Sequence, residues 1–239
     1  MRLLKLMLAG LLMLLPFPAL ADITAHYGVG PKDKLVVEAD GGGSLRASFG
    51  DRFALIRRDG VYYAVLILPN GEAKVADAAA VVDVVAGQMK GQMPTAMGGM
   101  MFEMKQGGES SHAGFGGTTW LFGPVPGGPE RPNEKPFEVL ITTDPALAPV
   151  GIFFHRFSEL MGPMLGLVFG GNTNLGPLAT ELFAKGTPLK IGDALTLETI
   201  DRAEIPADRF ELPGPVIQPI EFLQAVMPSE SGAGLPALP

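Results

Sequence analysis

Residues 34–68 read KLVVEADGGGSLRASFGDRFALIRRDGVYYAVLIL. Short apolar segments alternate here with turn signals: DGGG at 40–43, GD at 50–51 and DG at 59–60. Glycine tolerates positive φ, and Asp-Gly or Asn-Gly turns match the twist of antiparallel strands. The pattern therefore predicts an antiparallel meander with strands over 35–39, 45–49, 53–57 and 61–68, and Asn70-Gly71 predicts a further hairpin.

The last of these predicted strands is apolar on both faces. Because side chains alternate along a strand, one face carries Val61, Tyr63, Val65 and Ile67, and the other carries Tyr62, Ala64, Leu66 and Leu68. Such a strand is either a central strand with a helix packed beneath it, or one of its faces lines an apolar cavity. The sequence leaves both interpretations open.

An Ala-rich helix is predicted over 78–93, where apolar residues recur at helical spacing until Pro94. Residues 95–136 are rich in Gly, Met and Pro and predict loops around one or two strands, with 118–122 the clearest. The part over 123–136 holds five prolines and predicts an exposed loop. A strand is predicted over 137–142.

A long helix is predicted over 146–169. Its apolar stripe consists of Phe153, Phe157, Leu160, Met161, Met164 and Val168. A membrane span is the alternative, but His155, Arg156, Glu159 and the Gly162-Pro163 step disfavour it. A short segment over 178–184 follows, and strands over 188–191, 195–200 and 209–212 are predicted to close the sheet.

The first 21 residues have the pattern of a cleavable signal peptide. Arg2 and Lys5 precede an apolar run, and Ala19-Leu20-Ala21 forms the cleavage site. The run is shorter than the ~20 residues that span a bilayer, so cleavage is favoured over an anchor. We therefore expect a periplasmic protein with one domain over 22–215 and a Pro-rich, partly disordered tail over 216–239.

Composition excludes several classes of protein. The chain has a formal net charge of −7, and loss of the leader makes it more negative. This disfavours nucleic acid and anionic membrane surfaces as main partners. The chain has no cysteine, so an exported form has no disulfides and must be stabilised by packing.

Candidate catalytic patterns are weak. His26, His112 and His155 lack metal-ligand spacing. In Ser110-Ser111-His112 the side chains are sequence neighbours that diverge, so they do not suit a pair of nucleophile and base. The glycines of 41–43 and 114–117 lack the residues of a phosphate-binding loop. Glu198, Asp201 and Glu204 fit a solvated acidic edge. We therefore expect no enzyme activity, no cofactor and no metal site.

Methionines are the unusual feature, at positions 89, 93, 97, 100, 101, 104, 161 and 164. Methionine adapts to varied apolar shapes, so it suits either core filling or a groove for apolar ligands. If a groove exists, we expect its lining to include Tyr63, Val65, Met97, Met101, Trp120, Phe153, Phe157, Met161 and Met164.

The order of these segments resembles a known group of exported proteins. The resemblance rests on the meander over 34–68, on TTW at 118–120 with EVLITTDP at 138–145, and on GTPL at 186–189 with LETI at 197–200 and FELP at 210–213. The chain resembles the bacterial LolA-like group, particularly its uncharacterised DUF4412-type families. The resemblance implies an α+β fold, an antiparallel open half-barrel with helices packed on its concave face.

In the lipoprotein carriers of this group, the half-barrel holds acyl chains. The present sequence departs from those carriers because no arginine matches the one that gates their cavity, and 123–136 resembles an insertion. No functional residue of the family is therefore transferred to this chain. The sequence favours an exported protein that binds an apolar ligand such as a lipid or acyl chain. The alternative is an envelope structural or assembly factor that binds a protein partner.

Overall fold

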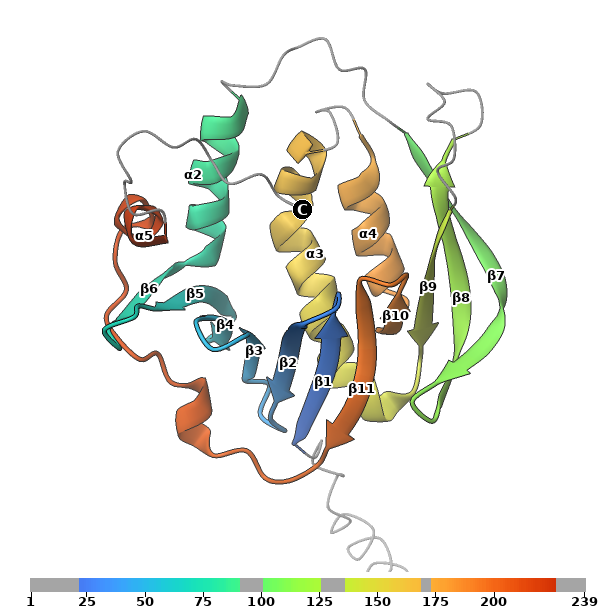
Figure 1. Ribbon diagram of the computed structural model, residues 1–239, viewed down its shortest axis with the longest axis horizontal. Coiled ribbons are helices and arrows are strands. Elements are labelled where there is room, and N and C mark those ends of the chain that lie inside the picture. The colour runs from blue at the N-terminus through green and yellow to red at the C-terminus, as the bar shows by residue number, and fades with distance from the viewer. Residues whose placement is uncertain (1–21, 91–100, 126–135, 169–172, 227–239) are drawn as a thin grey trace, which may run out of the picture.

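A computed structural model describes residues 22–90, 101–125, 136–168 and 173–226. These residues form an open antiparallel sheet of 11 strands in the order β6-β5-β4-β3-β2-β1-β11-β10-β9-β8-β7. The sheet curves around helices α2, α3 and α4, which cover its concave face (Figure 1). The predicted signal peptide, 1–21, and the end of the predicted tail, 227–239, lie outside the described residues. The observed fold is α+β, as expected, with β6 and β7 as the two edges of the sheet.

The meander is the part that the sequence predicted best. It consists of β2 Asp33–Ala39, β3 Leu45–Phe49, β4 Phe53–Arg58, β5 Val61–Ile67 and β6 Ala73–Asp77. At the β4–β5 turn, Asp59 and Gly60 both have positive φ, 52° and 82°. A two-residue turn of this kind requires positive φ at both positions, so Asp-Gly suits it. The predicted meander and the further hairpin are confirmed.

The three helices on the concave face are α2 Ala78–Lys90, α3 Ala148–Val168 and α4 Leu175–Phe183. The Asp144 side chain accepts a hydrogen bond from the Ala146 backbone N–H, 2.8 Å, and caps the short 3-10 turn Pro145–Leu147 that precedes α3. Pro163 lies inside α3, and the helix continues to Val168. Within the described ranges, no helix has the length and apolar character needed to cross a membrane.

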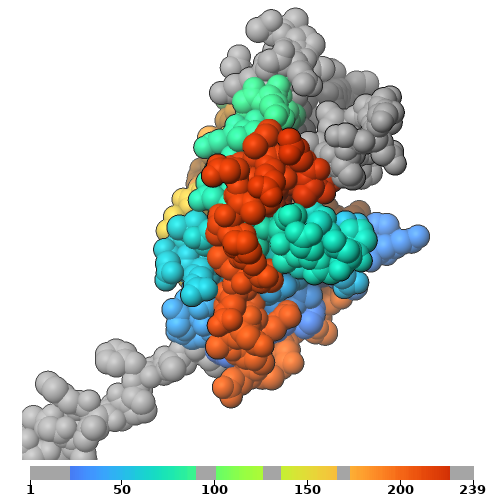
Figure 2. Space-filling model, turned by 90° about the vertical axis from the view of Figure 1, so that its left-hand side faces the viewer, coloured from blue at the N-terminus to red at the C-terminus, as the bar shows by residue number. Residues whose placement is uncertain are grey.

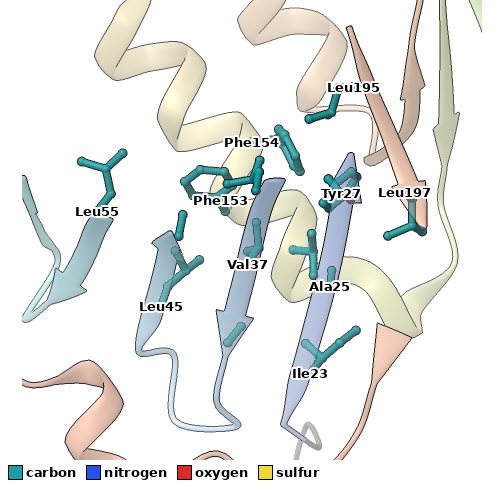
Figure 3. Close-up of a cluster of buried hydrophobic side chains, with 14 of the residues drawn as sticks. Ile23, Ala25, Tyr27, Val37, Leu45, Leu55, Phe153, Phe154, Leu195 and Leu197 are labelled. Atoms are coloured by element: carbon teal, nitrogen blue, oxygen red, sulfur yellow. The ribbon is translucent and has the colours of Figure 1, made fainter. Parts of the chain in front are cut away.

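The main core lies between α3 and the middle of the sheet. Phe153 and Phe154 project from α3 toward the strands, and Tyr27 and Val37 meet them from β1 Ile23–Val29 and β2 (Figure 3). The rings of Tyr27 and Phe154 form an edge contact with centroids 5.3 Å apart. These side chains are almost fully buried, so the core needs no disulfide to order it.

The other half of the sheet differs from the sequence predictions in several places. The loop-rich region over 95–136 contains a long hairpin, β7 Phe102–His112 and β8 Phe115–Pro124. Prediction missed β7 because it is an exposed edge strand, rich in Gly and charge, with little apolar alternation. The next strands are β9 Phe137–Thr142, β10 Thr187–Ile191 and β11 Leu195–Asp201. Of the predicted loop over 123–136, residues 126–135 lie outside the described residues.

The strand predicted over 209–212 is wrong. The structure has a 3-10 turn at Ala207–Phe210, and this segment does not join the sheet. Phe210 is buried there, and Arg209 pairs with Glu38. Tertiary contacts of these two side chains therefore replace strand pairing.

This turn is part of a strap, defined here as residues 202–218, that crosses the convex face of the sheet. Leu212 packs against a cluster of Ala54, Ile56, Val65 and Val75 on that face. Val216 then forms a parallel bridge with Val75 of β6. The strap leads to α5 Pro219–Val226, part of the predicted tail, which packs against α2 and β6 (Figure 2).

Candidate functional site

An apolar groove of about 500 Å³ lies between the meander and the helices. Its floor is made by β3, β4 and β5, and its walls by α2, α3 and α5. Among the described residues, the lining consists only of apolar ones: Phe49, Phe53, Leu55, Ala64, Ala78, Val81, Val82, Val85, Phe157, Leu160, Met161, Met164 and Phe222. Pockets that hold small molecules have volumes of roughly 300–1,000 Å³, so this groove has the size of a ligand site.

Small side chains on the floor and on one wall create this space. Ala64 of β5 lies opposite Leu55 of β4 in the strand register, and the facing wall of α2 presents alanine and valines. A larger residue at Ala64 or Val82 would fill volume that is now open. The groove is therefore a direct result of the short side chains that the Ala-rich helix supplies.

Three of the residues expected to bind an apolar ligand lie together in this groove. Phe157, Met161 and Met164 line it along one face of α3. Phe153, one turn earlier, is fully buried in the core below, with its ring stacked on Phe157 at 5.5 Å between centroids. The apolar stripe of α3 thus serves both purposes, core filling at one end and groove lining at the other.

The structure places the other expected residues elsewhere. Tyr63 and Val65 lie on the convex face, in the cluster with Leu212. Trp120 packs between β8 and α4, with Lys185 Nζ 4.8 Å from its ring centroid. Met101, just before β7, is 49% exposed, and Met97 lies outside the described residues.

Sequence reasoning missed most of the lining. The face of β5 that contributes Ala64 was recognised as apolar, but the sequence did not show which of its two faces was the inner one. Phe222 was missed because residues 216–239 were interpreted as a tail, although Ile-Glu-Phe-Leu at 220–223 contains an apolar pair. Both residues at that pair, Phe222 and Leu223, are buried.

A polar corner borders the apolar groove. Arg57 and Tyr62 are partners across β4 and β5 and form the next pair after Leu55–Ala64 on the same face of the sheet, just beyond the lining residues of the groove. The Tyr62 hydroxyl is buried and has no hydrogen-bond partner in the part of the chain that the structure describes. Burial raises the pKa of Tyr62, while the positive charges of Arg57 and Arg156 act in the opposite direction and Glu159 adds to the rise.

A second cavity, of about 330 Å³, lies where β9 and β10 meet the start of α3. Asp144, His155 and Lys185 are titratable residues of its lining, which also includes Thr142, Thr143 and Thr187. His155 Nε2 lies 3.9 Å from Glu159 Oε1, too far for a hydrogen bond, and the Ser158 hydroxyl donates to the His155 carbonyl oxygen. The serine is therefore turned to the backbone and not to the imidazole.

The remaining candidate residues do not assemble. His112 Nε2 lies 2.8 Å from the Leu197 carbonyl oxygen, while Ser110 and Ser111 are exposed on β7. Across the described ranges, no group of three or more His, Cys, Asp or Glu side chains is placed to hold a metal. The apolar groove is therefore the candidate functional site, because its lining residues share one chemical character.

These features define a class of architecture: an open antiparallel sheet whose concave face is covered by helices, with an apolar groove between the two layers. Comparison with family models, with curated proteins and with solved structures found no match for the chain. Membership of the LolA-like group therefore stays a prediction.

Proposed function

We propose that this protein binds an apolar ligand, such as a lipid or acyl chain, in the groove between the meander and helices α2, α3 and α5. The observation that supports the proposal is the lining, in which every residue that the structure describes is apolar. Filling such a groove with an apolar ligand removes apolar surface from water, which contributes about 25 cal/mol per Å². Met161 and Met164 suit chains of differing shape because methionine has several rotatable bonds.

The proposal also includes the cellular location and the type of the protein. We infer an exported, periplasmic protein of the LolA-like half-barrel type from the leader pattern of residues 1–21 and from the order of segments in the sequence, and we propose no enzyme activity because the catalytic patterns in the sequence are weak. Mass spectrometry of the N-terminus after expression in a Gram-negative host tests the first part. A chain that starts at Asp22 is expected, and one that retains Met1 would refute cleavage at this site.

Native mass spectrometry of the protein purified without detergent tests ligand binding. We expect a bound mass that disappears after organic extraction, and uptake of a fluorescent fatty acid by the extracted protein. A clean apo mass together with no uptake of the fluorescent fatty acid would refute the proposal.

A protein partner is the second candidate, and a specific observation favours it. Val216, Ile220 and Val226 are 50%, 50% and 44% exposed on the strap and α5. Large apolar side chains exposed in one short segment are typical of an interaction surface. Cross-linked pull-down from the envelope should lose its partner when these three residues become serine, whereas uptake of the fluorescent fatty acid should be unaffected.

A further inference from the structure

The floor of the groove changes character along its length. Successive cross-strand pairs of β4 and β5 on the concave side are Phe53–Leu66, Leu55–Ala64 and Arg57–Tyr62. The first two pairs are apolar, and the third carries a guanidinium and a phenol. A long ligand lying on this floor therefore meets an apolar environment over most of its length and a polar one at one end.

The Tyr62 hydroxyl at this end is an unused hydrogen-bond donor. Its oxygen is buried, and no partner for it exists among the residues that the structure describes. Buried hydroxyls without a partner are rare in folded proteins and call for an explanation such as a water or ligand atom. A phenol has an ordinary pKa of about 10, so the Tyr62 hydroxyl carries its proton at neutral pH and can donate.

The charges around this hydroxyl favour an anion. Arg57 and Arg156 are the cations that act on Tyr62, and Glu159 is the anion. The Arg57 guanidinium donates to the Gly43 carbonyl oxygen at 2.8 Å, which ties it to the turn between β2 and β3. The Arg156 guanidinium donates to Glu159 at 2.7 Å, so this pair is neutral and the Arg57 charge remains. The corner is thus positive in a chain whose net charge is −7.

From this arrangement we propose that the ligand is a single-chain amphiphile with a carboxylate head, of the free fatty acid class. The acyl chain lies in the groove, the carboxylate accepts a hydrogen bond from the Tyr62 hydroxyl, and Arg57 supplies the facing positive charge. This inference rests on the proposed function, because it requires the groove to be the binding site. It adds the direction in which the ligand lies and the chemistry of its polar end.

Two probes with the same chain separate the head group from the chain: palmitate and its methyl ester, each measured by displacement of a fluorescent fatty acid from the extracted protein. We expect palmitate to bind about tenfold more tightly than the ester, the difference typical of a hydrogen bond to a charged acceptor. Tyr62→Phe should remove most of this preference by weakening palmitate binding alone. Tyr63→Phe is the matched control, because Tyr63 packs on the convex face, and it should change neither affinity.

Equal affinity of the two probes, or equal effects of Tyr62→Phe and Tyr63→Phe, would overturn the head-group assignment and leave the apolar-ligand proposal intact. Failure of both probes to bind would overturn both proposals. A two-chain phospholipid as the species released on extraction would also overturn the single-chain assignment. Circular dichroism and thermal unfolding of both tyrosine variants show whether each retains the native fold.

Discussion

The Arg209 guanidinium and the Glu38 carboxylate form a two-point ion pair on the convex face, with Nε to Oε1 at 3.0 Å and Nη2 to Oε2 at 2.7 Å. The Glu38 side chain is 8% exposed, and Arg46 Nε lies 3.8 Å from the same carboxylate. The Arg46 guanidinium also donates to the Arg209 carbonyl oxygen at 3.1 Å. This network fixes the strap to β2 and β3 and so positions the segment that leads to α5.

Replacing Glu38 by Gln should destabilise the protein by about 1–3 kcal/mol, because two guanidinium groups lose their shared counter-charge in a largely buried place. Urea unfolding measures the change. Glu198→Gln is the control, since Glu198 pairs with Lys34 where both side chains are about half exposed, and its cost should be roughly 0–1 kcal/mol. Equal costs for the two variants would contradict a structural role of the Glu38 network.

Stability should fall at alkaline pH. Burial raises the pKa of Tyr27, so the folded state disfavours the phenolate that the unfolded state forms above about pH 10. The stabilising effect is fully present below pH 10 and is lost as the pH rises toward the folded-state pKa. Chemical denaturation between pH 7 and pH 11 should show a plateau followed by a decline.

Tyr27→Phe should flatten this decline. At pH 7 the variant should lose about 1 kcal/mol, because the Tyr27 hydroxyl donates to the Pro188 carbonyl oxygen at 3.0 Å. The two effects have opposite signs at alkaline pH, so the curves of variant and wild type should converge. Parallel curves over the whole range would show that Tyr27 does not control the alkaline transition.

Filling the groove should weaken ligand uptake without unfolding the protein. Val82 lines the groove, whereas Val84, two residues along α2, does not. Val82→Phe should lower the affinity for a fluorescent fatty acid at least about tenfold, because it occupies volume that the chain would take. If Val84→Phe weakens uptake as strongly, the ligand site lies elsewhere.

Packing of α5 against the groove should contribute to the stability of the fold. Phe222 is 2% exposed and lines the groove, while Ile220 of the same helix is 50% exposed. Phe222→Ala should cost about 2–4 kcal/mol by creating a cavity, and Ile220→Ala should stay within about 0.5 kcal/mol of wild type. Thermal unfolding measures both. Similar small effects for the two variants would show that α5 is not held against the groove.

The sequence by itself determined the local structure in the regions where pattern and turn chemistry agree. The meander over 34–68 and the long helix after Asp144 were predicted because Asp-Gly turns, alternating apolar residues and helical spacing are encoded over a few residues. The apolar stripe of α3, with Phe157, Met161 and Met164, was visible for the same reason. The composition also excludes disulfides within the chain, since it has no cysteine.

Only the tertiary structure decided which faces meet. Tyr63 and Ala64 are neighbours in sequence, yet one packs under the strap and the other lines the groove. Both faces of β5 are apolar, so alternation alone could not tell the inner face from the outer one. The strap distinguishes the two faces, because Leu212 packs on the convex face and the 3-10 turn with the buried Phe210 contacts β3 and β4, all more than 100 positions away in sequence. Contacts at such separation leave no periodic trace in the sequence, and they place Phe222 at the groove.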